Sequence, residues 1–212
     1  MNPATETEVQ SIQKLNPLVN IWTNPRRTVR YIIENKKFAW VFLFVSLAGI
    51  STILDAMSSA NIADKVNTDI GGIFFFSILL GPLFGLVFWA LSGLLYWGIG
   101  KVFKGSASFK EILKATAWAN IPIVLSLLLW IPDIQVFKLG AFSAFPPPLS
   151  PGEGGIIIAS SIIEMVLSVW YIIILIKAIA EAHQFSSWKA LGTAILPGGV
   201  MLIFIAMLMF VS

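Results

Sequence analysis

One ionisable side chain stands well inside a long apolar stretch of the sequence, and it is the first candidate for chemistry. Glu164 interrupts an otherwise uncharged run over residues 154–176. It belongs to a polar stripe with spacings of three, four and three, which one face of a helix would carry: Ser161, Glu164, Ser168 and Tyr171. We expect this stripe to point toward other helices, with Ser51 and Ser126 as candidate partners of the carboxyl group.

Two main interpretations of Glu164 remain open at this stage. A charge at the centre of a bilayer costs about 3 kcal/mol on insertion scales, so such residues usually face protein or water. Glu164 is therefore either part of a proton or cation relay, or a protonated carboxyl group that bonds to serines and fixes helix register. Contact with a partner protein is a third role.

The composition argues against most enzyme classes. The sequence has no cysteine and a single histidine, His183, which excludes thiolate chemistry and a His-rich metal site within one chain. The motifs of zinc hydrolases, serine hydrolases and P-loop nucleotidases are absent. We interpret His183 as a solvated or interfacial residue of a turn. The sequence predicts neither a catalytic site nor a cofactor or metal site.

The elements that must position these residues are apolar helices. Hydrophobic residues make up 57% of the 212 residues, and the mean hydropathy is +0.86. About 20 apolar residues cross the ~30 Å hydrocarbon core as a helix. The pattern predicts an all-α integral membrane bundle of five transmembrane helices, over Phe38–Leu54, Ile70–Gly100, Ala115–Pro132, Gly154–Ile176 and Ala190–Ser212.

The distribution of basic residues predicts an orientation. A cytoplasmic amino terminus places twelve of the fourteen lysines and arginines inside and leaves only Lys65 and Lys138 outside. We therefore predict a multi-pass protein of the cell (plasma) membrane with an extracytoplasmic carboxyl terminus. Six of the inner cations are candidates for docking a partner: Arg26, Arg27, Arg30, Lys101, Lys104 and Lys110.

The segment before the first span divides into two parts. Residues 1–20 are predicted to form a mobile polar arm, and residues 21–212 a single five-span domain. Asn24 and Pro25 have the residue types of a helix start. Val29 and Ile32 recur on the apolar face of the helix that follows. We expect this amphipathic helix to lie in the inner membrane interface.

Two further local patterns concern helix packing and helix ends. Gly81 and Gly85 form a small-residue seam that lets another helix approach closely, within the chain or from a partner. Pro82 predicts a kink in the same helix. Ser108 and Glu111 have the spacing of a capping box at a helix start.

Three stretches of the chain resemble one known family. They are NIWTNPRRTVRYIIE (residues 20–34), GKVFKGSASFKEIL with AWANIP (100–113 and 117–122), and IAEAHQFSSWKAL (179–191). Their order and spacing resemble the Yip family of five-span membrane proteins. Its eukaryotic members are the Rab-GTPase-interacting Golgi proteins, and it has numerous bacterial relatives. Leu80 stands where eukaryotic members carry an acidic residue before Gly-Pro-Leu, so this chain is similar to the bacterial branch.

The resemblance implies a helical membrane domain that acts through partners and has no reaction of its own. Some bacterial relatives are thought to accompany ABC-type exporters and envelope-stress defences. We therefore predict a non-enzymatic accessory or scaffold protein that binds the lipid bilayer and other membrane proteins, and no nucleic acid. Self-association is left open. The alternatives are a small transporter or channel using Glu164, and a lipid-interacting, membrane-shaping protein.

Overall fold

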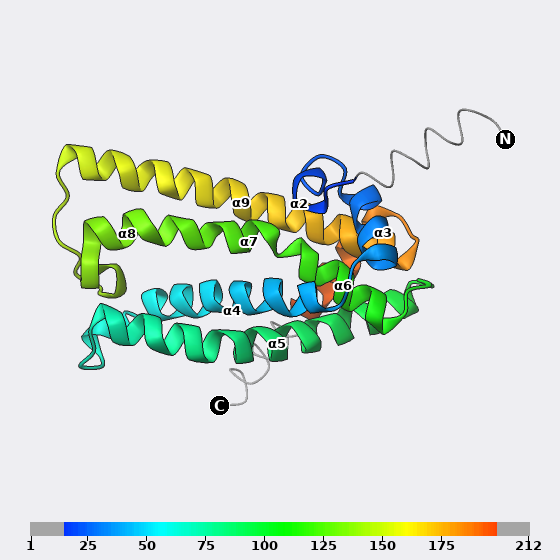
Figure 1. Cartoon of the computed structure of the whole chain (residues 1–212), viewed down its shortest axis with the longest axis horizontal. Coiled ribbons are helices and arrows are strands. Elements are labelled where there is room, and N and C mark those ends of the chain that lie inside the picture. Colours follow the sequence, from blue (N-terminus) through cyan, green and yellow to red (C-terminus); the bar gives the residue numbers. More distant parts are fainter. Residues whose placement is uncertain (1–14, 199–212) are drawn as a thin grey trace, which may run out of the picture. The chain divides into compact units, whose positions relative to one another are not determined.

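A computed structural model describes residues 15–198, and no strand occurs in that range (Figure 1). The α-helices are α2 (Pro17–Asn20), α3 (Pro25–Asn35), α4 (Ala39–Ser59), α5 (Ile70–Val102), α6 (Phe109–Ala119), α7 (Ile121–Ser126), α8 (Trp130–Phe137) and α9 (Pro151–His183). The 3-10 turns are η1 (Ile62–Asp64), η2 (Leu127–Leu129) and η3 (Lys138–Phe142). Residues 187–198 are also helical.

Four helical stretches are long and apolar enough to cross a membrane. They are Ala39–Ser59, Ile70–Val102, Phe109–Phe142 and Pro151–His183. They correspond to the first four predicted spans. The predicted fifth span, residues 190–212, lies largely outside the described residues, and so does most of the predicted polar arm.

The chain divides into two compact units, each built from separated segments. We call residues 15–40, 90–119 and 173–198 the basic unit, because it has eleven lysines and arginines against three acidic residues. Residues 41–89 and 120–172 form the acidic unit, with six acidic residues against two lysines. Both α5 and α9 contribute residues to each unit. The two units therefore carry net charge of opposite sign.

In the acidic unit, two helices are longer than predicted. Asp55 lies within α4 and Asp133 within α8, although the sequence predicted loops from these positions onward. An apolar cluster stabilises these helix ends. Leu54, Ile73, Trp130 and Phe142 are buried together, and partly buried hydrophobic side chains pack around them. The Trp130 and Phe142 rings stack with centroids 5.1 Å apart. Burial of this cluster offsets the cost of extending the helices into polar sequence.

Hydrogen bonds fasten the loops beside this cluster. The Ser58 hydroxyl donates to the Ala141 carbonyl oxygen at 2.7 Å. The Ser143 hydroxyl and the Ala144 backbone N–H donate to the Asp64 carboxylate at 2.6 and 2.7 Å. These two bonds favour the ionised form and lower the pKa of Asp64.

The small-residue seam of α5 packs on α4 within the chain. A Cβ atom at Gly85 would lie 2.5 Å from the Val45 carbonyl oxygen and 2.9 Å from the Gly49 Cα atom. A Cβ atom at Gly81 would lie 2.6 Å from the Ile50 Cα atom. Backbone thus meets backbone here, and α4 occupies the seam that we considered as a partner-docking surface. Pro82 sits inside α5, which continues as one helix from Ile70 to Val102 (Figure 1).

In the basic unit, α3 packs on α6. The apolar face of α3 is covered by protein, because Val29 and Ile32 both have 0% exposure. Pro25 opens α3 as predicted, but the Asn24 side chain makes no capping bond and instead donates to the Thr23 hydroxyl. The amphipathic pattern of α3 therefore reflects tertiary packing.

The segment before α3 is ordered earlier than predicted. Residues 17–20, which we assigned to the polar arm, form α2. The Asn16 side chain accepts a hydrogen bond from the Leu18 N–H at 3.1 Å, and Ile21 is fully buried just after the helix. A side-chain cap and one buried apolar residue stabilise this short helix.

The entry to the third span agrees with the prediction. The Ser108 backbone N–H donates to Glu111 Oε2 at 2.7 Å, and the Glu111 N–H donates to Ser108 Oγ at 3.3 Å. This is the reciprocal pattern of a capping box. The helix is interrupted at Asn120, between α6 and α7, just before Pro122.

We predict that Gly85→Ala destabilises the protein and that Gly98→Ala, in the same helix, does not. The added methyl group at Gly85 would collide with the α4 backbone, whereas nothing lies within 4 Å of the Gly98 position. Overpacking of this kind costs about 1–3 kcal/mol. The measurement is the thermal unfolding midpoint in detergent, and equal midpoints for the two variants would contradict the α4–α5 packing.

Candidate functional site

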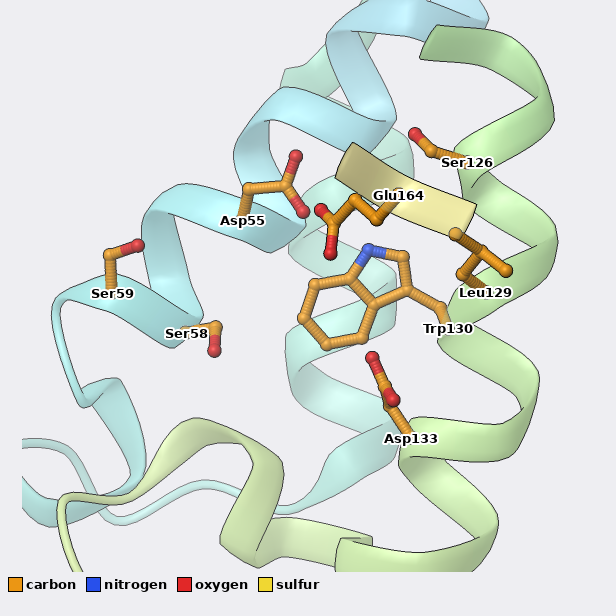
Figure 2. Close-up of a pocket in the computed structure, with 8 residues that line it drawn as sticks. All are labelled: Asp55, Ser58, Ser59, Ser126, Leu129, Trp130, Asp133 and Glu164. Atoms are coloured by element: carbon orange, nitrogen blue, oxygen red, sulfur yellow. The ribbon is translucent and has the colours of Figure 1, made fainter. Parts of the chain in front are cut away.

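The acidic unit encloses a polar cavity of about 200 Å³ (Figure 2). Residues from α4, from the α7–α8 segment and from α9 line it: Asp55, Ser58, Ser59, Ser126, Leu129, Trp130, Asp133 and Glu164. Three carboxyl groups far apart in the sequence thus face one space. Burial of the Trp130–Phe142 stack positions the helix ends that supply two of them.

The Trp130 indole stands at the centre of this arrangement. Figure 2 shows the Asp55 and Glu164 carboxyl groups pointing toward the indole nitrogen, with Asp133 on the other side of the ring. The indole N–H bonds to Asp55, and Trp130 is only 9% exposed. Glu164 thus lies beside both aspartates in one polar space.

This arrangement suits a cation or a proton better than a covalent reaction. Carboxyl groups accept and release protons and attract cations, and serine hydroxyls can bridge them through hydrogen bonds. Within residues 15–198 no group of three or more histidine, cysteine or acidic side chains has the geometry to hold a metal ion. A nucleophile paired with a base is not among the lining residues.

The structure brings only part of the predicted polar stripe to the cavity. Glu164 lines it together with Ser126, one of the suggested partners, and the Ser51 and Ser126 hydroxyl oxygens lie 3.2 Å apart. Ser161 and Ser168 are exposed on α9. Tyr171 is half-buried and is not among the lining residues. The role of the stripe stays a prediction.

Sequence reasoning missed Asp55, Asp133 and Trp130 as companions of Glu164. Each aspartate was assigned to the end of a span, because a charge usually marks where an apolar run stops. The spacing of Trp130 and Asp133, three residues apart, is compatible with one helix face and is the signal that could have suggested a shared site. Their convergence with Glu164 depends on tertiary packing.

The basic unit contains a second polar centre around Glu181. Arg30 donates from Nε to the Glu181 carboxylate and from Nη2 to the Glu181 carbonyl oxygen, both at 2.9 Å. Arg26 lies 3.5 Å from the same carboxylate and donates to the Phe185 carbonyl oxygen at 2.6 Å. Two of the six cations predicted to dock a partner thus tie α3 to the end of α9.

His183 is buried, contrary to our expectation of a solvated or interfacial residue. It is 1% exposed, and its ring stacks on Phe185 with centroids 5.0 Å apart. Its Nε2 atom lies 3.1 Å from the Tyr96 carbonyl oxygen. A Cβ atom at Gly100 or Gly105 would collide with the imidazole ring. The ring therefore fills the space that two glycines leave, which sequence spacing alone does not reveal.

The other predicted docking cations remain at the surface of the basic unit. Arg27, Lys101, Lys104 and Lys110 are exposed. Lys101 and Lys110 both lie near Glu111: the charge of Lys101 acts on Glu111, and Lys110 precedes it in the chain. The predicted docking set is therefore divided between internal bonds and the surface.

Comparison with known proteins identifies the family of this chain. The family model of the Yip1 domain matches residues 19–208. This chain belongs to the Yip1-domain family. No curated protein and no solved structure matches the chain.

In this Yip1-domain protein, the stretches that carry the family resemblance meet in the basic unit. Residues 20–34 supply Arg26 and Arg30, residues 179–191 supply Glu181 and His183, and residues 100–113 supply the turn that covers His183. Segments that are far apart in the sequence thus make one connected set of contacts in the basic unit.

We predict that Glu181→Gln destabilises this Yip1-domain protein and that Glu34→Gln does not. Arg30 lies 4.0 Å from the exposed Glu34, a distance at which surface pairs contribute about 0–1 kcal/mol. Its hydrogen-bonded contact with Glu181 should contribute about 1.5 kcal/mol or more. Unfolding midpoints of Arg30→Gln, Glu181→Gln and the double variant provide the coupling between the two residues. Additive losses would show that the pair is not coupled.

Proposed function

We propose that this Yip1-domain protein is a non-enzymatic accessory subunit that binds other membrane proteins, with an ABC-type exporter or an envelope-stress system as partner. The observation that supports this most is the uncompensated charge of the basic unit. Two of its three acidic residues are engaged internally, Glu181 with Arg30 and Glu111 with Ser108. The exposed Lys101 and Lys110 can meet acidic segments of a partner, since complementary charge steers association.

The membrane orientation belongs to the same proposal. Basic loops stay on the cytoplasmic side, so the loops that carry Lys101, Lys104 and Lys110 lie in the cytoplasm, and Lys65 and Lys138 lie outside the cell. The amino terminus is then cytoplasmic, and a fifth span over residues 190–212 places the carboxyl terminus outside. The bacterial branch of the family fits this location.

A pull-down from intact cells tests the proposal. Affinity-tagged protein extracted in mild detergent should recover a multi-span membrane protein, identified by mass spectrometry. Lys101→Gln with Lys110→Gln should reduce its recovery roughly tenfold, because each cation near an acidic surface contributes about 1 kcal/mol. Lys65→Gln with Lys138→Gln, in the acidic unit, is the matched control and should leave recovery unchanged.

Chemical labelling of the same lysines from outside the cell tests the orientation. An impermeant amine reagent applied to intact cells should modify Lys65 or Lys138 and spare Lys101 and Lys110. Equal recovery of the partner by all variants would contradict docking through the basic unit. Labelling of Lys101 in intact cells would contradict the orientation.

A second candidate function is a small transporter or channel that uses Glu164. The cavity favours it, because three carboxyl groups and an indole line one polar space next to long apolar helices. Intramembrane acids in such settings mark ion pathways and proton relays. Glu164 would carry the proton or cation, with Asp55 and Asp133 as its neighbours.

Liposome flux separates this candidate from the accessory function. Proton or monovalent-cation flux should be measurable with the wild-type protein and fall at least tenfold in Glu164→Gln, because an amide neither binds a proton at neutral pH nor carries charge. Ser161→Ala, about one turn away on the same helix and not among the residues that line the cavity, should retain the flux. Absence of flux with the wild type would end this candidate.

The membrane-shaping alternative rests on the apolar face of α3, which Val29, Ile32 and Ile33 form. Val29 and Ile32 are fully buried within the basic unit, and Ile33 is half-buried. Little of this face is left for the acyl chains, so this alternative has less support than the other two.

A further inference from the structure

Three lysines lie on or bond to two turns of the basic unit. The Lys177 side chain donates to the Ser187 hydroxyl at 3.1 Å. The Lys189 side chain reaches the Phe103 carbonyl oxygen at 3.4 Å, which joins the turn over residues 184–189 to the turn over residues 100–105. Lys104 follows Phe103 directly in the second of these turns and is exposed.

The two turns are held in place by His183. The Ser106 N–H donates to the His183 carbonyl oxygen at 3.0 Å, and the Gly105 N–H donates to the Gly100 carbonyl oxygen at 2.8 Å. The imidazole ring lies against both glycines. Lys104 adopts a left-handed backbone conformation, with φ of 63°, which a residue with a side chain keeps only where its surroundings enforce it. The cations therefore stand on a constrained backbone.

No carboxylate of the described residues pairs with these three lysines. Within residues 15–198, none of the three lysines has an acidic side chain at ion-pair distance, since the ion pairs of that range involve only Arg26, Arg30 and their glutamates. The hydrogen bonds of Lys177 and Lys189 go to neutral oxygens, those of Ser187 and Phe103. Lys177 and Lys189 each keep N–H donors for a further acceptor, because an ammonium group has three.

The position of the three lysines indicates the anion. The two turns follow the ends of α5 and α9, which are membrane-length helices of 33 residues each. Each measures about 50 Å, more than the ~30 Å hydrocarbon core, so their ends reach the headgroup layer. Trp188 is 81% exposed beside Lys189, and Val102 is 79% exposed at the end of α5. Indole rings prefer this depth, where acyl chains meet headgroups.

We propose that Lys104, Lys177 and Lys189 bind the phosphate of an anionic phospholipid in the membrane leaflet that these two turns reach. Trp188 then packs against the glycerol and the upper acyl chain of this lipid. The phosphate accepts the free N–H donors and neutralises charge that the chain leaves uncompensated. Lys177 reaches the headgroup layer by extending along its helix toward Ser187. This site is independent of the proposed protein partner, which uses Lys101 and Lys110.

Lipid retention by the full-length protein tests this site. The protein is reconstituted with equal amounts of phosphatidylglycerol and phosphatidylcholine, re-extracted in mild detergent and weighed with its bound lipids by native mass spectrometry. The wild type should retain phosphatidylglycerol in preference to phosphatidylcholine. Lys177→Gln with Lys189→Gln should lower that retention roughly tenfold, and Lys104→Gln should lower it severalfold.

Controls separate this site from general surface charge, from free phosphate and from misfolding. Lys37→Gln with Lys110→Gln removes two exposed cations elsewhere in the basic unit and should retain phosphatidylglycerol like the wild type. Lys177→Arg with Lys189→Arg keeps the charge and should restore retention. Equal retention of the two lipids by the wild type would overturn the proposal. So would an equal loss in the Lys37 and Lys110 control, or displacement of the lipid by glycerol 3-phosphate. A co-purified acidic protein in place of lipid would overturn it as well.

Discussion

Hydrocarbon offers no hydrogen-bond partner to a peptide group, and the long helices of this chain follow from that constraint. Helices α5 and α9 run for 33 residues each without interruption, and α5 does so despite Pro82. The span Phe109–Phe142 is less regular: α6 gives way to α7 at Asn120, with Pro122 following, and the 3-10 turns η2 and η3 occur further along it. Because charge is costly along these lengths, ionisable residues collect toward the helix ends.

The basic unit and the acidic unit use their charges differently. In the basic unit, arginines and a glutamate join α3 to α9, and a buried histidine locks the adjoining turn. These contacts stabilise a scaffold and leave lysines unpaired at its surface. This arrangement suits the two partners that we propose, an acidic protein segment and a lipid phosphate, because both would complement its positive charge.

The acidic unit brings its charges together instead of dispersing them. Asp55, Asp133 and Glu164 share a cavity with Trp130, whose ring is held by Phe142. Three carboxyl groups in one space repel one another when they are ionised, and the indole hydrogen bond to Asp55 and access to water stabilise such charge. The same packing that lengthens α4 and α8 produces this cavity. It is the feature of the chain that favours ion or proton movement.

The sequence by itself determined the helical class, four of the membrane-length stretches, the capping box at Ser108 and the family. These depend on hydropathy over a window, on local hydrogen bonds and on ordered motifs, all of which are legible along one dimension. Only the tertiary structure decided that α4 occupies the Gly81–Gly85 seam, that His183 is buried and that Arg30 bonds to Glu181. It also decided that the two aspartates join Glu164. Each of these depends on side chains separated by tens of residues, whose meeting is set by packing and not by spacing.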